Sequence, residues 1–318
     1  YQNQMEISLN ETGNYYWFVK AFNICGQAQH SDTINFEIID GFNHLSAWFD
    51  PDFNLEIDEY NNILSWTSRS ENLILSIGSD SASAPDFKNQ YLNGHKLINL
   101  DGINDKLFSN NPVRVCEAFV IANYLGAQSF LNYNCLLGSN ETTSKLYIVA
   151  GETQTQNLYT GGGTLFGSNF SINNLSGSNF APLDQLKLVY GYSSVPFDFP
   201  KLALGGVTTI TSRFWKGQVA EILLFDTVLS SLEKEEVKKY LHFKYSNPVD
   251  LGYDKNVSYG FDTLSIEAGN QFLSYLWNTG DTTPFIKTNK AGTYSVTVTD
   301  IFGFTSSDDI KVVYPEIF

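Results

Sequence analysis

The chain has few of the side chains that carry most redox and metal chemistry. Its 318 residues include three cysteines, four histidines and one methionine. Cys25, Cys116 and Cys135 cannot form a disulfide scaffold, because at least one thiol is left unpaired. The histidines, at positions 30, 44, 95 and 242, lack the spacing of zinc ligands. The sequence therefore excludes a disulfide-rich scaffold and gives little support to a zinc site.

Basic side chains and long apolar runs are also scarce. Nineteen lysines and arginines stand against 34 aspartates and glutamates, so the formal net charge is −15. This charge repels phosphate backbones and anionic lipids, and we expect no nucleic-acid partner. No apolar run is long enough to span a bilayer, so no transmembrane segment is expected. The chain opens with Tyr1-Gln2-Asn3, neither an initiator methionine nor a signal peptide, which indicates a mature product or a piece of a longer protein.

The clearest local pattern lies in residues 217–245. Apolar residues occupy both faces of residues 219–225, where only Glu221 is polar, and this predicts a strand that is covered on each side. Ser230 and Glu233 fit a capping box, so a helix should follow. One stripe of this helix is predicted to pack on a β body: Val237, Tyr240, Leu241 and the stem of Lys244.

Several short motifs in a fixed order carry a family resemblance. Residues 47–50 read Ala-Trp-Phe-Asp, residues 64–67 read Leu-Ser-Trp-Thr, and residues 94–107 run from Gly94 to Leu107. Together with residues 217–245, this order resembles the laminin-G-like, concanavalin A-type jelly roll of bacterial surface proteins. The resemblance spans about 200 residues, the size of one large β domain. It implies an all-β fold with one short helix near the end of the domain.

An internal repeat flanks this region. Residues 12–19 align with residues 291–298, and residues 31–36 align with residues 307–312. Each copy predicts the last hairpin of an immunoglobulin-like sandwich. The C-terminal copy, with Trp277 as its core plug, resembles the PKD-like or Ig-like modules of secreted Bacteroidetes proteins. The N-terminal copy has only its final strands and fits the end of a fibronectin type III module equally well.

We therefore predict an all-β protein with three parts. Residues 1–39 are the C-terminal part of an Ig-like or fibronectin III-like module, residues 40–247 are the jelly roll, and residues 248–318 are an Ig-like or PKD-like module. Cys116 and Cys135 lie near opposite ends of a predicted hairpin and could pair. A simple register puts Cys135 nearer Phe119, so buried thiols are favoured over a disulfide.

Loops rich in Asn, Gly, Ser and aromatic residues are predicted at 156–163, 167–180 and 191–200. Exposed rings in such loops offer flat apolar faces for sugar CH groups, and Asn and Asp bind hydroxyls. The alternative is that these rings anchor their own loops in the domain. The candidate carbohydrate platform consists of Tyr124, Tyr159, Tyr192, Phe197 and Phe199, with Asn157 and Asp198 as polar partners.

One turn is a candidate cation site. Asp101-Gly102 is a hairpin signal, and Asp101, Asn104 and Asp105 put three oxygen-bearing side chains in that turn. Ca²⁺ prefers such ligands. Turn chemistry is the favoured interpretation, because the same turn belongs to the family pattern. No cofactor is required by the sequence.

Catalysis is not expected. Laminarinase-type enzymes on this architecture carry a Glu-x-Asp-x-x-Glu run, and the nearest equivalent here is Glu221 to Asp226 with Leu223 in the middle. On a regular strand, Glu221 and Asp226 face opposite ways. Glu221 is expected to hydrogen-bond inside the sandwich. Residues 161–163, a glycine triplet, follow no strand-to-helix pattern that would cradle phosphate.

The predicted function is adhesion at a bacterial cell surface or in a secreted protein. The jelly roll would bind a glycan or another surface ligand, and the flanking modules would act as spacers beside further modules of the same polypeptide. This combination is similar to the large surface adhesins of gliding Bacteroidetes. Two alternatives stay open: a structural or docking subunit of a cell-envelope assembly, and binding modules attached to a secreted polysaccharide hydrolase.

Overall fold

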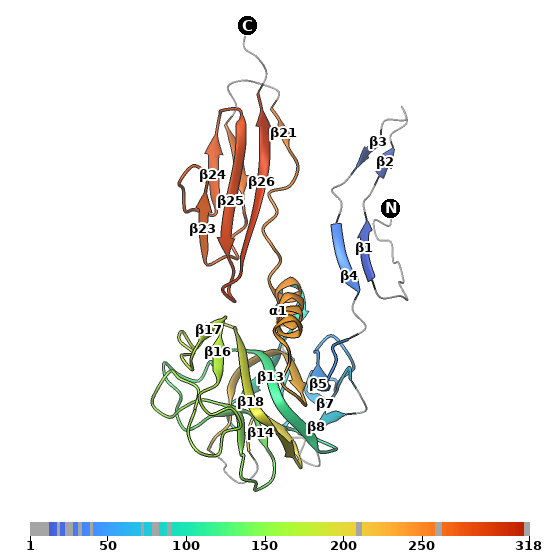
Figure 1. The fold of residues 1–318 in the computed structure, drawn as a ribbon, viewed down its shortest axis with the longest axis vertical. Coiled ribbons are helices and arrows are strands. Elements are labelled where there is room, and N and C mark those ends of the chain that lie inside the picture. The colour runs from blue at the N-terminus through green and yellow to red at the C-terminus, as the bar shows by residue number, and fades with distance from the viewer. Residues whose placement is uncertain are drawn as a thin grey trace. The chain divides into compact units, whose positions relative to one another are not determined.

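The structure is a computed structural model that describes residues 13–17, 20–22, 28–30, 34–38, 41–70, 73–77, 83–87, 91–207, 212–257 and 263–314. Its regular elements are strands and one helix, so the fold is all-β, as predicted (Figure 1). The chain divides into two compact units, Tyr1–Asn43 and His44–Phe318. None of the described residues forms a helix long and apolar enough to cross a bilayer.

The described residues of the N-terminal unit form two antiparallel strand pairs. β1 (Gly13–Trp17) pairs with β4 (Ile34–Ile38), and β2 (Lys20–Phe22) pairs with β3 (Ala28–His30). The predicted hairpin joins residues 12–19 to residues 31–36, and the structure describes residues 13–17 and 34–36 of it. Cys25 lies outside the described residues.

The second unit begins with a seven-stranded sheet, here called the first sheet. Strand β20 (Lys216–Phe225) lies at its centre and pairs with β13 (Val113–Ala122) on one side. The main path continues with β18 (Lys187–Phe199), β16 (Phe170–Ile172) and β17 (Leu175–Ser176). Two further strands pair with β20: β11 (Ile98–Asp101) and β5 (Leu45–Phe49).

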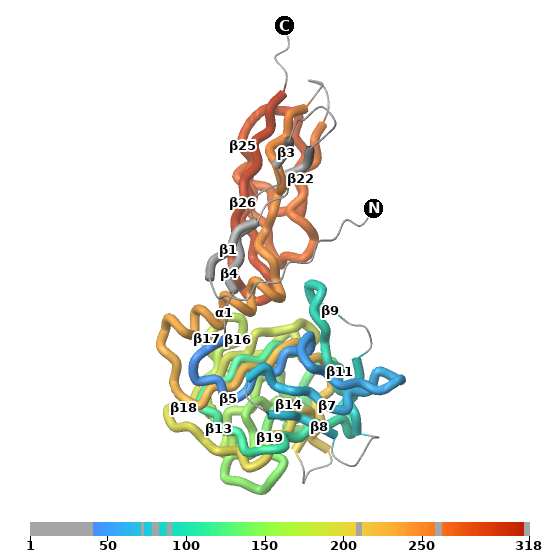
Figure 2. Tube along the Cα trace, turned by 90° about the vertical axis from the view of Figure 1, so that its right-hand side faces the viewer, coloured from blue at the N-terminus to red at the C-terminus, as the bar shows by residue number. Residues whose placement is uncertain are grey.

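The second sheet also has seven strands. Their order is β15 (Tyr147–Ala150), β14 (Cys135–Ser139), β19 (Leu202–Leu204), β12 (Leu107–Ser109), β8 (Ile74–Ser76), β7 (Ile63–Thr67) and β6 (Leu55–Ile57). A small separate hairpin joins β9 (Tyr91–Leu92) to β10 (His95–Lys96). Figure 2 labels β14, β19, β8 and β7 of this sheet, and β9 of the hairpin, along the chain trace.

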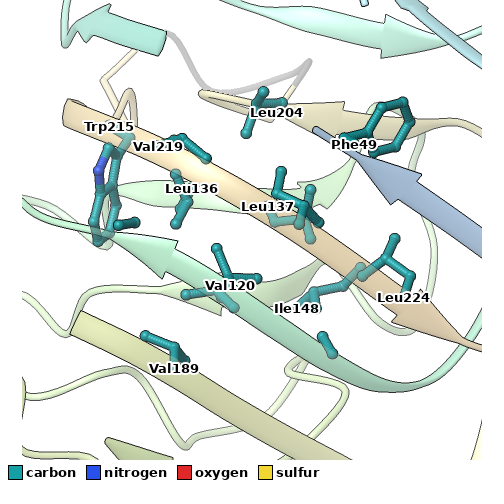
Figure 3. Close-up of a cluster of buried hydrophobic side chains, with 14 of the residues drawn as sticks. Phe49, Val120, Leu136, Leu137, Ile148, Val189, Leu204, Trp215, Val219 and Leu224 are labelled. Carbon is teal, nitrogen blue, oxygen red and sulfur yellow. The ribbon is translucent and has the colours of Figure 1, made fainter. Parts of the chain in front are cut away.

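Both sheets contribute side chains to one hydrophobic core. Phe49, Val120 and Leu224 come from the first sheet, and Leu137 and Leu204 come from the second (Figure 3). Since side chains alternate along a strand, every second residue of these strands turns away from this core. On the first sheet, the outward residues of β20 include Glu221 and Leu223, and both are fully buried.

Helix α1 (Ser231–Tyr245) accounts for that burial. The predicted capping box is confirmed: the Ser230 side chain accepts from the Glu233 amide, and the Glu233 carboxylate accepts from the Ser230 amide. The helix buries Val237, Leu241 and Tyr245. The strand and helix predicted for residues 217–245 are therefore both present.

Glu221 accepts four hydrogen bonds from neighbouring side chains. The Trp48 indole N–H and the Tyr240 hydroxyl donate to Oε1 at 2.6 and 2.7 Å. The Lys244 ammonium and the Tyr245 hydroxyl donate to Oε2 at 2.9 and 2.6 Å. The predicted hydrogen bonding of Glu221 is thus confirmed. Its place is different, because the donors come from α1 and β5 on the outer side of the first sheet.

Three local predictions were wrong because strand pairing is set by distant parts of the chain. Asp101-Gly102 does not close a hairpin: β11 pairs with β20 in the first sheet, whereas the next strand, β12, pairs with β8 and β19 in the second. β13 and β14 likewise belong to different sheets. Cys116 and Cys135 are therefore not hairpin partners, and both are buried free thiols.

The third wrong prediction is the loop at 191–200. Most of this segment continues strand β18, which pairs with β13 up to Phe199. A register shift between Val115 and Glu117 accommodates the irregular part that contains Pro196, and such bulges tolerate proline. The predicted loop at 167–180 also contains the short strands β16 and β17.

The C-terminal residues form a separate hydrophobic core. A four-stranded sheet has the order β21 (Lys255–Asn256), β26 (Thr305–Val313), β25 (Gly292–Thr299) and β23 (Ser274–Trp277). A second sheet pairs β22 (Leu264–Glu267) with β24 (Phe285–Thr288). Trp277 is fully buried in this core, as predicted.

Candidate functional site

The predicted carbohydrate platform is not brought together by the fold. Tyr124 is in the core, where its ring lies 4.7 Å from Phe130 and 5.2 Å from Trp215 between ring centroids. Phe199 is fully buried, and Phe197 packs against the same core. All three rings anchor their own segments in the domain. The prediction that Tyr124 and Phe199 face a sugar was wrong, because neither ring reaches the surface.

The remaining members of the platform lie in separate places. Tyr192 is 39% exposed and stacks on Tyr190 on strand β18 of the first sheet. Asp198, also on β18, accepts two hydrogen bonds from Arg114. Tyr159 and Asn157 belong to the loop that follows β15 of the second sheet. Tyr192 and Tyr159 thus belong to elements of different sheets.

The Asp101 turn uses its own oxygen atoms. Asp101 Oδ1 accepts from the amides of Ile103, Asn104 and Asp105, and Asp105 Oδ2 accepts from the Asp101 amide at 2.6 Å. Burial, together with the neighbouring carboxylate of Asp101, raises the pKa of Asp105 to about 7, although the hydrogen bond from the Asp101 amide opposes this rise. Among the described residues, no group of three or more His, Cys, Asp and Glu side chains is placed to hold a metal. These hydrogen bonds are the ones expected if the Asp101 and Asp105 carboxylates stabilise the turn itself.

A row of directly paired residues crosses the second sheet on its outer face. The strand register pairs Ser65 with Ser76, Ser76 with Phe108, Phe108 with Ala203, Ala203 with Gly138, and Gly138 with Tyr147. Neighbours in the strands, such as Leu107 and Leu204, point into the core, so this row points away from it. Four of its six residues are small, and Phe108 therefore stands out as the ring in the middle.

A hollow of about 350 Å³ lies beside Phe108. Its lining is mostly polar and comes from the ends of several strands of the second sheet. The lining residues are Ser76, Phe108, Ser109, Asn110, Glu141, Pro200 and Lys201. A half-buried ring, one carboxylate, one ammonium group and an amide thus meet in one depression.

Two lysines hold positive charge over the Phe108 ring. The Lys201 ammonium lies 5.4 Å from the ring centroid and the Lys106 ammonium lies 5.5 Å from it. At these distances an ammonium is attracted to the ring face. Glu141 in the same hollow is exposed. The combination suits a ligand that has both an apolar face and several hydroxyl groups, because each polar group here can donate to or accept from a hydroxyl.

A second aromatic group occupies the end of the row at Tyr147. The ring of Tyr159 lies 5.8 Å from that of Tyr147 and 4.8 Å from that of Tyr133. The Arg213 guanidinium lies over Tyr133 and Tyr147 and donates to the Tyr147 hydroxyl. Tyr159, one of the predicted rings, therefore lies next to the residues of the second sheet's outer face.

Sequence reasoning missed Phe108, Lys201 and Arg213. Phe108 sits in a strand where buried and partly exposed residues alternate, which indicates one outward ring, but nothing in the local pattern tells which strands lie beside it. No model of a known protein family matches the chain, and no curated protein matches it either. The candidate site is therefore defined by its geometry alone.

Proposed function

We propose that the chain is a non-catalytic segment of an extracellular or cell-surface protein that binds a glycan through the hollow beside Phe108. In this proposal residues 40–247 form a concanavalin A-like jelly roll, and the two ends of the chain belong to Ig-like modules. The shared core of the two seven-stranded sheets and the separate core around Trp277 support this division.

One observation carries the binding site: a ring with two ammonium groups over it lies in a polar hollow. Aromatic rings bind the apolar faces of sugars, while the polar groups around a ring bind hydroxyls. Asn110 Oδ1 accepts from the Ile74 amide at 2.9 Å, which fixes the orientation of that side chain at the rim. The polar groups of the hollow are thus held on strand ends, which favours a preformed site.

The test is a glycan array with the full chain, followed by titration calorimetry on the glycans that bind. We expect Phe108→Ala to weaken binding by about fivefold to thirtyfold, since loss of one stacked ring costs of the order of 1–2 kcal/mol. Phe285→Ala is the matched control, because Phe285 is an exposed phenylalanine on strand β24, which belongs to the C-terminal part of the chain with the separate core around Trp277. Equal binding by both variants would place the site elsewhere.

A second candidate function is structural docking within a cell-envelope assembly, which a C-terminal module fixed to the rest of the chain would suit. His242 Nδ1 of α1 lies 2.7 Å from Asp300 Oδ2, and the Asn173 amide donates to the Ile301 carbonyl at 2.8 Å. Side chains of helix α1 and of the turn between β16 and β17 thus contact the turn between β25 and β26. An array on which no glycan binds would favour this second function.

A further inference from the structure

Arg213 has fewer partners than a guanidinium offers donors. Its guanidinium donates to the Tyr147 hydroxyl, and its Nε is buried without a hydrogen-bond partner among the described residues. None of the described carboxylates forms an ion pair with it. A guanidinium carries five N–H donors in a planar fork, and a buried donor without a partner is costly. Arg213 as a whole is partly exposed, so an external acceptor that reaches its other N–H groups would supply part of the missing hydrogen bonding.

The surroundings hold the guanidinium in place. Its central carbon lies 5.0 Å from the Tyr133 ring centroid and 5.8 Å from that of Tyr147. Tyr159 packs edge-on against both rings. Nearby, Asn132 donates to Ser212 at 2.8 Å, so the segment before Arg213 is also tied to the loop that carries Tyr133. An arginine that stacks on rings loses little freedom when it binds a planar anion.

Positive charge continues from Arg213 toward the hollow. Phe214 is the next residue in the chain, and its ring lies 5.3 Å from the Lys106 ammonium, which in turn lies over Phe108. Along the strand order, Tyr147 and Phe108 are separated by three strand spacings, or roughly 14 Å. Three cations, beside the Glu141 carboxylate at the hollow, therefore lie along one face of a chain whose net charge is −15. Between Phe108 and Tyr147 the small residues Ala203 and Gly138 are buried, and a short oligosaccharide is long enough to pass over them.

We infer that the saccharide bound on the outer face of the second sheet carries an anionic group, a carboxylate or a sulfate, and that Arg213 binds this group. The inference rests on the proposed function and names its ligand class. The Arg213 fork matches two oxygens of either anion. Lys106 and Lys201 attract the same ligand through their charge and hold its next residues beside Phe108.

The test compares ligands that differ only in charge. A hexamer of galacturonic acid and its carboxyl-reduced neutral counterpart would be titrated calorimetrically into the full chain, and a sulfated form of the neutral hexamer would form a third arm. We expect at least one anionic hexamer to bind about tenfold or more tightly than the neutral one. The stronger of the two anionic arms tells carboxylate from sulfate. If the neutral hexamer binds and neither anion binds more tightly, this inference is overturned while the proposed function stands.

Two variants separate the fork from its charge. Arg213→Gln should remove the preference for the anionic hexamer and leave binding of the neutral one unchanged within about twofold, and Arg213→Lys should restore only part of the preference. Lys287→Gln is the matched control, because Lys287 is an exposed cation on strand β24. A preference lost equally in Arg213→Gln and Lys287→Gln would show a general charge effect and overturn the assignment. Loss of neutral binding in Phe108→Ala alone, with the anion preference kept, would support separate roles for the two sites.

Discussion

The buried charges that join helix α1 to the first sheet allow a quantitative test of what holds the two together. Glu221 is completely buried, and the side chains of Asp50 and Lys244 are 2% and 9% exposed. Lys244 lies 2.9 Å from Glu221 and 2.8 Å from Asp50, and Arg69 lies 2.8 Å from the second oxygen of Asp50. Two negative and two positive groups thus balance, and all of them except Arg69, whose side chain is 40% exposed, are largely buried. Removing one of them leaves an uncompensated charge.

The directions of the pKa shifts agree with this balance. Burial would raise the pKa of Asp50, but the contacts with Lys244 and Arg69 outweigh it, and the pKa is lowered. For Glu221, burial prevails over Lys244 and the pKa is raised. Without Lys244, both carboxylates would lose their shared counter-charge. Each would then favour protonation or exposure, and both responses weaken the attachment of the helix.

We expect Lys244→Met to lower the free energy of unfolding by about 3–5 kcal/mol, the usual cost of removing one member of a buried ion pair. For a domain of this size, that loss corresponds to a decrease in Tm of roughly 6–20 °C. The control is Lys238→Met on the same helix, whose partner Glu235 is 67% exposed. A surface pair contributes at most about 1 kcal/mol, so this control should change Tm little. The assay is thermal unfolding of the full chain followed by circular dichroism at the helix wavelength.

A double variant tests the cause. Glu221→Gln combined with Lys244→Met removes one charge of each sign and leaves Asp50 paired with Arg69. The cost of the double variant should fall short of the sum of the two single costs by about 1–3 kcal/mol. Equal destabilisation by Lys244→Met and Lys238→Met, or full additivity in the double variant, would refute the argument that charge balance holds the helix.

Two further predictions concern the turn after β11. The pKa of Asp105 is about 7 in the folded chain instead of 3.8, so between pH 4 and pH 7 the folded chain keeps a proton that the unfolded chain has released. The free energy of unfolding should therefore decrease as the pH rises through this range, by up to about 4 kcal/mol. Urea unfolding at several pH values measures this profile, and Asp105→Asn should flatten it. A steeper decrease in the variant would contradict this. Gly205 has φ +89°, and a Cβ there would lie 2.4 Å from the Asp105 carbonyl oxygen, whereas Gly94 has φ +82° and open space around it. Gly205→Ala should therefore destabilise the fold clearly more than Gly94→Ala. The Gly94 variant measures the backbone strain alone, about 1–3 kcal/mol. Equal losses of Tm would show that the close approach does not matter.

Local sequence patterns predicted local structure well in this chain. The strand and the capped helix of residues 217–245 depend on side chains within a few positions of one another, so period and capping chemistry define them. Trp277 could be placed in a core for a similar reason, because a large apolar residue in an alternating strand needs a buried face. The all-β class was implied by the family resemblance of the short motifs and by the alternating strands of the internal repeat.

Pairing between distant strands could not be predicted in the same way. Asp101-Gly102 has the chemistry of a hairpin turn, yet β11 pairs with β20 in the first sheet, whereas β12 pairs with β8 and β19 in the second. The segment 191–200 has the composition of a loop, but both of its ends, residues 191–192 and 197–199, pair with β13 and keep it in strand β18. Register across a sheet depends on which faces become buried, and that is decided by the whole domain.

The candidate site shows the same limit for aromatic residues. A ring in a loop rich in glycine and asparagine has two possible roles: it can face a ligand or tie the loop to the domain. Tyr124 and Phe199 took the second role, because their backbones continue strands whose inner faces fill the core. Phe108 lies on an outward strand position between Ser76 and Ala203, where small neighbours leave its ring partly uncovered. A binding ring is therefore better sought on the outer face of a paired strand with small cross-strand neighbours than in the loops with the most aromatic residues.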